Sequence, residues 1–75
     1  MKTVLITGAA GDVGTHLRRE LVGKYALRVS DLRPVKKIDK AERFMRADVS
    51  EMADALRITK GVDAVVHLGG YSVEG

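Results

Sequence analysis

Three glycines, Gly8, Gly11 and Gly14, recur at every third position where a strand-like run gives way to a helical pattern. The run before them, residues 3–7, is β-branched and aliphatic and contains no breaker, which predicts a strand buried on both faces. The first N–H groups of a helix have no partner inside it, and the helix dipole adds partial positive charge there. This order of elements therefore predicts an anion-binding site.

Each glycine has a separate physical reason. Gly8 lets the chain leave the strand in a turn, Gly11 lets the backbone approach a pyrophosphate, and Gly14 lets the helix pack closely. Asp31 ends a second strand-like run, at about the distance typical of the dinucleotide-binding fingerprint. A glycine-rich turn with an unrelated surface aspartate is the alternative, and the combination favours a dinucleotide site.

Asp31 also bears on which dinucleotide binds. A carboxylate there accepts hydrogen bonds from both hydroxyls of the adenosine ribose and repels a 2′-phosphate, which favours NAD over NADP. Arg33 is the opposing signal, because a nearby arginine can accommodate that phosphate. We predict that NAD is preferred.

Other side chains that could do chemistry are fewer. Asp48 is either a turn residue before a helix or an acceptor for the adenine amino group. His67 lies within a strand-like run and is predicted to be packed and hydrogen-bonded, and the Ser72 hydroxyl is available to a substrate. No histidine or carboxylate group has metal-ligand spacing. A P-loop is excluded, because Thr15 and not lysine follows Gly14.

Two helices are expected to position these residues. The first runs from the glycine turn to Gly23, with an apolar stripe facing the sheet and residues 18–20 facing water. The second is predicted to have Ser50 as its N-cap and to end at Gly61. The residues predicted to pack are Val13, Leu17 and Leu21 in the first helix, and Met52, Ala55, Leu56 and Thr59 in the second.

Four strands are expected, at residues 3–7, 25–30, 43–47 and 63–68, with a basic loop at residues 35–41. Right-handed crossovers and the switch-point rule predict an α/β fold, a Rossmann-like parallel sheet with strand order 3-2-1-4. The glycine turn, Asp31, Asp48 and Gly69–Gly70 all follow carboxyl ends of strands. These loops should therefore converge on one rim, where open α/β sheets bind ligands.

Composition limits the remaining possibilities. At 75 residues the chain is at most one small domain, and chains of this size are marginally stable alone. Cysteine is absent, which fits a cytoplasmic location, and no apolar run is long enough to span a membrane. The net charge of +3 is mild and aromatic residues are scarce, so we expect no nucleic-acid partner.

These motifs resemble a known family. Residues 7–14 (TGAAGDVG) match the TGxxGxxG turn of the extended short-chain dehydrogenase/reductase superfamily, whose members include NAD-dependent epimerases and dehydratases. Asp31-Leu32, Asp48-Val49 and residues 67–70 (HLGG) match its next landmarks in order. The run 67–74 (HLGGYSVE) looks specifically like uronate dehydrogenases, which use NAD to oxidise galacturonate or glucuronate at C1 to the aldarolactone.

The resemblance implies roles for individual positions. Gly8, Gly11, Asp12 and Val13 would line the pyrophosphate. Asp31 and Leu32 would hold the adenine ribose, and Asp48 and Val49 the adenine. Leu68, Gly69 and Gly70 would run toward the nicotinamide, and Ser72 would contact the sugar acid, with a tyrosine as the base.

The chain departs from this family in one respect. Neither tyrosine is followed four positions later by a lysine, so the catalytic Tyr-x-x-x-Lys is missing. We expect residues 1–75 to be the N-terminal part of an NAD-binding Rossmann domain without its substrate half, inactive alone and prone to self-association through the fourth strand. The alternatives are a nucleotide-sugar epimerase or dehydratase, or a non-catalytic dinucleotide-binding module.

Overall fold

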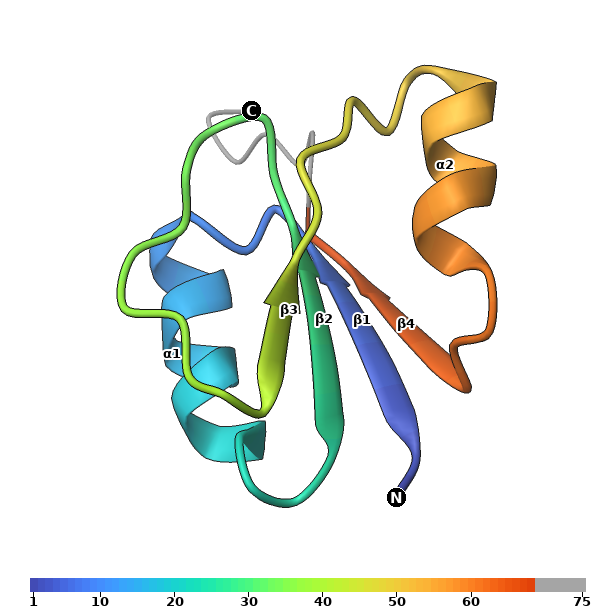
Figure 1. Ribbon diagram of the computed structural model, residues 1–75. Helices are drawn as coiled ribbons and strands as arrows, with labels where there is room; N and C mark the ends of the chain where they lie inside the picture. Colours follow the sequence, from blue (N-terminus) through green and yellow to red (C-terminus); the bar gives the residue numbers. More distant parts are fainter. Residues whose placement is uncertain (69–75) are drawn as a thin grey trace.

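The computed structural model describes residues 1–68, and these form one parallel sheet with a helix on each face (Figure 1). The expected strand order is confirmed: the sheet runs β3-β2-β1-β4. In chain order the elements are β1 (Thr3–Thr7), α1 (Asp12–Leu21), β2 (Ala26–Ser30), β3 (Glu42–Phe44), α2 (Met52–Thr59) and β4 (Ala64–His67). Residues 33–41 form a loop, which includes the 35–41 segment expected to be one.

β1 is the central strand, in register with β2 on one side and with β4 on the other. Successive side chains of a strand point to opposite faces, so β1 contributes to two cores. Val4 and Ile6 pack with Leu27 and Val29 under α1. Leu5 packs with Ala47 and Ile58, the buried residue of α2.

Glycines end both helices as predicted. Gly23 and Gly61 have φ values of +88° and +79°, which are left-handed conformations that suit the position after a helix C-cap. Nothing lies within 4 Å of a Cβ built at either glycine, so their requirement is conformational and not steric.

Parts of the predicted helix packing are wrong. Val13, Met52 and Leu56 are 66%, 73% and 63% exposed, although each was expected to face the core. Arg18 was expected in water and is instead buried against Glu42. Leu17 and Leu21 pack against the core, whereas Val13, in the first turn of α1, lines a cavity.

The predicted N-cap of α2 is also wrong. Glu51 occupies that position and makes no side-chain cap bond. The backbone N–H and the hydroxyl of Ser50 both donate to Asp48 Oδ1, at 2.9 and 2.6 Å, so this serine closes an Asx turn.

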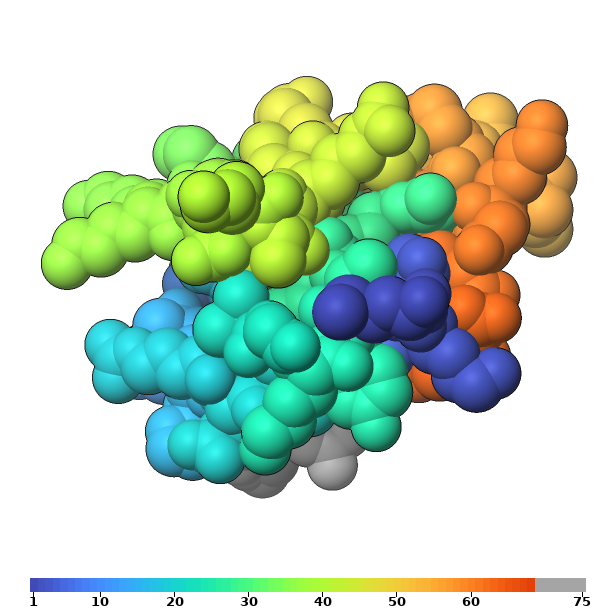
Figure 2. Space-filling view, turned by 60° about the horizontal axis from the view of Figure 1, so that its bottom comes forward, coloured from blue at the N-terminus to red at the C-terminus, as the bar shows by residue number. Residues whose placement is uncertain are grey.

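The N-terminus of the chain lies at the end of the sheet where the four strands begin. In Figure 2, which brings that end forward, the first residues (dark blue) lie at the surface between the green and orange segments. The carboxyl ends of all four strands therefore face away from the N-terminus, toward the rim that the sequence predicts to be functional.

Candidate functional site at the carboxyl ends of the strands

A cavity of about 510 Å³ opens at the carboxyl ends of the strands. It is lined from four separate segments: the glycine turn, the end of β2, the 47–50 segment and the end of β4. All the predicted site residues that lie within residues 1–68 line it, namely Gly8, Gly11, Asp12, Val13, Asp31, Leu32, Asp48, Val49 and Leu68. The predicted residues Gly69, Gly70 and Ser72 lie outside the described residues.

The glycine turn has the geometry that its spacing predicts. Gly8 has φ +70°, a left-handed conformation that lets the chain reverse after β1. A Cβ on Gly14 would lie 2.7 Å from the Gly8 carbonyl oxygen and from Ala9 Cα, so only glycine allows the helix this close. A Cβ on Gly11 would meet nothing closer than 3.6 Å. Gly11 therefore has no steric requirement within the described residues.

The start of α1 is open toward the cavity. Its N-cap is Gly11, with extended backbone and no side-chain cap bond. The N–H groups of a first helical turn have no acceptor inside the helix, and the dipole makes this end partially positive. Backbone N–H groups would therefore hold an anion at this place.

Two hydrogen bonds tie the glycine turn to β2. The backbone N–H of Ala9 donates to the Ser30 carbonyl oxygen at 3.1 Å. The next N–H, that of Ala10, donates to Asp31 Oδ2 at 3.0 Å. Asp31 is thereby fixed beside the turn, although it lies 21 positions later in the chain.

The Asp31 carboxylate is only 8% exposed and is held by Arg33 as well. The Arg33 backbone N–H donates to Oδ1 at 3.0 Å, and its guanidinium donates to both oxygens at 3.3 Å. Burial acts to raise the pKa of Asp31, but the hydrogen bonds from Arg33 and Ala10 outweigh it and leave the pKa lowered. Asp31 is therefore a fixed anion at neutral pH.

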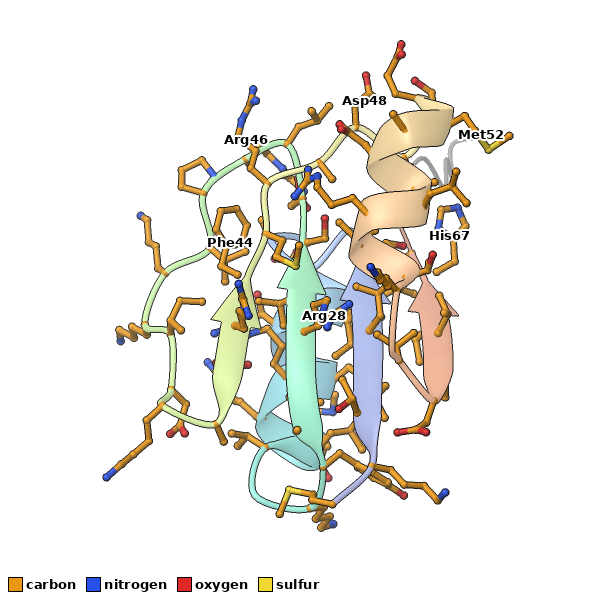
Figure 3. The ribbon with its side chains drawn as sticks, turned by 45° about the vertical axis from the view of Figure 1, so that its right-hand side comes forward. Arg28, Phe44, Arg46, Asp48, Met52 and His67 are labelled. Atoms are coloured by element: carbon orange, nitrogen blue, oxygen red, sulfur yellow. The ribbon has the colours of Figure 1, made fainter. Side chains whose placement is uncertain are left out.

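Asp48 lines the same cavity and lies at the upper rim in Figure 3. The side-chain and backbone hydrogen bonds from Ser50 lower the pKa of Asp48. Its Oδ1 is used by Ser50, and its backbone N–H donates to Asp54 Oδ2 at 2.9 Å. Val49 and the half-exposed Leu32 add apolar surface to the same cavity.

Ser30 is a lining residue that sequence reasoning missed. Its side chain is fully buried, and within residues 1–68 its hydroxyl is the buried side-chain polar atom with no hydrogen-bond partner. An unpaired buried hydroxyl is costly, so it needs an explanation. The available signal was a small polar residue directly before Asp31, at the end of a buried strand.

His67 lies at the end of β4, near the upper rim of the sheet in Figure 3. Its Nδ1 lies 2.7 Å from the Thr7 hydroxyl, so it is hydrogen-bonded as predicted, but it is exposed and not packed. The Leu68 N–H donates to the same hydroxyl at 3.1 Å. Thr7 therefore joins β1 to the end of β4 beside the glycine turn.

Two further classes of feature are absent from the part of the chain that the structure describes. Within residues 1–68, no three histidine, aspartate or glutamate side chains gather as a metal site. None of the helices there is long and apolar enough to cross a membrane.

Comparison with known proteins gives consistent matches. Residues 4–75 match the NAD dependent epimerase/dehydratase family. The chain is 40% identical over 74 residues to uronate dehydrogenase of Pseudomonas putida, covering 95% of this chain and 27% of that protein. It is 37% identical over 73 residues to the enzyme of Pseudomonas syringae pv. tomato, covering 95% of this chain and 26% of that protein.

Solved structures agree. A variant of uronate dehydrogenase from Agrobacterium tumefaciens, complexed with NAD, superposes with a TM-score of 0.89 at 37% identity, covering 100% of this chain and 29% of that one. MoeE5 in complex with UDP-glucuronic acid and NAD gives 0.75 at 33% identity, covering 88% of this chain and 22% of that one. The chain thus spans less than a third of the length of these relatives.

The family match covers nearly the whole chain, and both the sheet order and the glycine turn fit it. The chain belongs to the NAD dependent epimerase/dehydratase family.

Proposed function

We propose that residues 1–75 form the NAD-binding part of an oxidoreductase that oxidises a uronate at C1 to the aldarolactone. The observation that carries this proposal is the single cavity that collects the predicted residues from four separate segments. The uronate dehydrogenases that resemble this chain, one of them complexed with NAD, support the choice of reaction.

The residues present fit NAD in three respects. The uncapped start of α1 suits a diphosphate, and the open space beside Gly11 allows the backbone to approach it. The fixed Asp31 anion suits ribose hydroxyls. The unpaired hydroxyl of Ser30 is a buried group that a ligand or an ordered water can satisfy.

In this proposal each segment of the cavity has one task. The glycine turn, with Asp12 and Val13, holds the diphosphate. Asp31 and Leu32 hold the adenosine ribose, and Asp48 and Val49 border the adenine. Leu68, Gly69 and Gly70 direct the chain toward the nicotinamide, and Ser72 contacts the sugar acid.

Bound NAD supplies a hydride acceptor for the anomeric carbon of the sugar. These 75 residues contain no Tyr-x-x-x-Lys to take the hydroxyl proton. We therefore propose the activity for a longer cytoplasmic protein in which these residues are the N-terminal part of the cofactor domain, and we expect the 75 residues alone to be inactive.

The test uses the protein at its full encoded length. We expect galacturonate or glucuronate to reduce NAD, measured by the absorbance of the reduced nicotinamide, with no reaction from UDP-glucuronic acid. Activity only with UDP-glucuronic acid would favour a nucleotide-sugar enzyme, for which the likeness to MoeE5 is the supporting observation.

A matched pair of glycine variants tests the cavity itself. Gly11→Ala adds a methyl group that the protein can hold, so it should keep its stability while NAD affinity falls about tenfold or more. Gly23→Ala, at the far end of α1, should leave NAD affinity unchanged. Equal NAD affinity in the wild type and Gly11→Ala would exclude diphosphate binding at this turn.

A further inference from the structure

Arg33 and Asp31 both line the cavity, and the Arg33 guanidinium lies against the Asp31 carboxylate. Its Nε and Nη2 atoms lie 3.3 Å from Oδ1 and Oδ2 of Asp31. Its Nη2 is also 3.6 Å from the place a Gly11 Cβ would occupy. The cationic group therefore lies close to both the glycine turn and the carboxylate.

Asp31 has no acceptor capacity left in this arrangement. A carboxylate offers about four lone-pair sites. Two are used by the N–H groups of Ala10 and Arg33 at 3.0 Å, and two by the Arg33 guanidinium. Ribose hydroxyls can donate to Asp31 only if some of these bonds break.

The side-chain bonds of Arg33 are the weaker pair. They are 0.3 Å longer than the bonds to backbone N–H groups, and the Arg33 side chain is 66% exposed whereas that of Asp31 is 8% exposed. The backbone bonds also hold the turn together, while the guanidinium is free to move into solvent. The bonds from the guanidinium are therefore the ones that break most readily.

We propose that Arg33 competes with the adenosine ribose for the Asp31 carboxylate and thereby narrows the preference for NAD over NADP. This inference rests on the proposed dinucleotide function. Binding of NAD displaces the guanidinium without giving it a new anionic partner. A 2′-phosphate gives the displaced guanidinium a partner, so NADP regains part of what repulsion by Asp31 removes.

The expected change in NAD affinity is small because the Arg33 side chain is largely exposed. Exposed ion pairs contribute little, so releasing Asp31 from the guanidinium should tighten NAD binding by about two- to fivefold. Loss of the phosphate partner should weaken NADP binding by about tenfold. Salt screens an exposed pair, so the gain for NAD should shrink as ionic strength rises.

The experiment is calorimetry on the full-length protein with Arg33→Met, which removes the charged guanidinium and keeps an unbranched apolar side chain. NAD and NADP are the main ligands. 5′-AMP and adenosine 2′,5′-bisphosphate report on the ribose region alone. Arg43→Met is the matched control, because Arg43 is exposed on β3 and does not line this cavity. Arg33→Lys keeps a positive charge but cannot donate to both carboxylate oxygens as the planar guanidinium does.

We expect Arg33→Met to bind NAD and 5′-AMP more tightly and the two 2′-phosphorylated ligands more weakly, with Arg33→Lys in between and Arg43→Met unchanged. Weaker or unchanged NAD binding by Arg33→Met, in a protein that binds NAD, overturns the inference and leaves the proposed function standing. Failure of the wild type and of Arg33→Met to bind either cofactor overturns both.

Discussion

At the scale of single residues, Ser30 combines full burial with a hydroxyl that has no partner within residues 1–68. Burying such a group without a hydrogen bond costs about 1–3 kcal/mol. This cost is removed when a bound ligand or an ordered water forms a hydrogen bond with the hydroxyl. The hydroxyl is therefore a stability defect of the ligand-free protein and a candidate contact of the occupied one.

Ser30→Ala tests both halves of that statement. We expect the ligand-free variant to gain about 1 kcal/mol in free energy of unfolding, because the unsatisfied hydroxyl is gone. With saturating 5′-AMP the gain should disappear, since the wild type then has its partner. Urea unfolding with and without 5′-AMP measures this, and a less stable ligand-free variant contradicts it.

Gly14 is the residue at which a methyl group has no space. Gly14→Ala places a Cβ 2.7 Å from backbone atoms of the turn, which cannot rotate away as a side chain can. We expect a loss of about 1–3 kcal/mol in free energy of unfolding, by urea denaturation. Gly11→Ala, with its nearest contact at 3.6 Å, is the control and should lose far less.

The requirements at Gly8 and Gly14 could be predicted from the sequence because they depend on the backbone within one turn. The environment of Arg18 could not, because its partner Glu42 lies 24 positions away. A helical pattern that shows an arginine beside an apolar stripe gives no information on what faces it. Ser30 was missed for the same reason, since burial at the rim depends on three other segments.

At the scale of elements, α1 is joined to the first residue of β3 by a buried ion pair. Arg18 and Glu42 side chains are 9% and 2% exposed, with Nε to Oε2 at 2.7 Å and Nη2 to Oε1 at 2.8 Å. Nη2 of Arg18 also donates to the carbonyl oxygens of Lys36 and Lys37. The pair therefore fixes the course of the 33–41 loop across α1.

Arg18→Met should lower the free energy of unfolding by about 3–5 kcal/mol, because it leaves the Glu42 carboxylate buried and unpaired. The double variant with Glu42→Met should recover much of that loss, since both charges are then gone. Arg19→Met, the exposed neighbour, should stay within about 0.5 kcal/mol of the wild type. Equal losses for the two arginines in urea unfolding would show that the pair contributes nothing.

The same pair gives the protein an acid dependence. The hydrogen bond from Arg18 leads the causes that lower the pKa of Glu42, against the opposing effect of burial. A lowered carboxyl pKa adds stability above the ordinary glutamate pKa and loses it as the pH falls through the folded-state value. Glu42→Gln should therefore reduce the fall in melting temperature on acidification, and an unchanged acid slope contradicts this.

The apolar residues of the two helices show which part of helix packing the sequence pattern does not predict. Leu17 and Leu21 pack against the core as predicted, whereas Val13 lines the cavity. In α2 only Ile58 is buried, and Met52 and Leu56 are exposed. Spacing identifies an apolar face of a helix, but not the element that covers it.

At the scale of the whole molecule, strand order and rim could be predicted because crossover handedness leaves few topologies. The exposure of β4 follows from that order: it is an end strand, and Val65 is 49% exposed although the run reads as buried. An apolar strand edge of this kind is open to pairing.

We propose that the 75-residue chain alone self-associates through β4 or is largely unfolded. Val65→Lys should lower the average mass in sedimentation, because charge discourages edge pairing. Ile38→Lys is the control, since Ile38 is a similarly exposed apolar residue in the 33–41 loop. A monodisperse wild-type monomer that melts cooperatively contradicts this.

The two consecutive hydrogen bonds from Ala9 and Ala10 to the end of β2 have a practical consequence for redesign. The glycine turn, which we propose to hold the diphosphate, and the end of β2, which we propose to hold the ribose, cannot be altered independently, because these two bonds join them. A chimaera that takes the end of β2 from a relative would also have to take residues 8–11 from it. Otherwise the new carboxylate would not be held by the backbone N–H group of the turn.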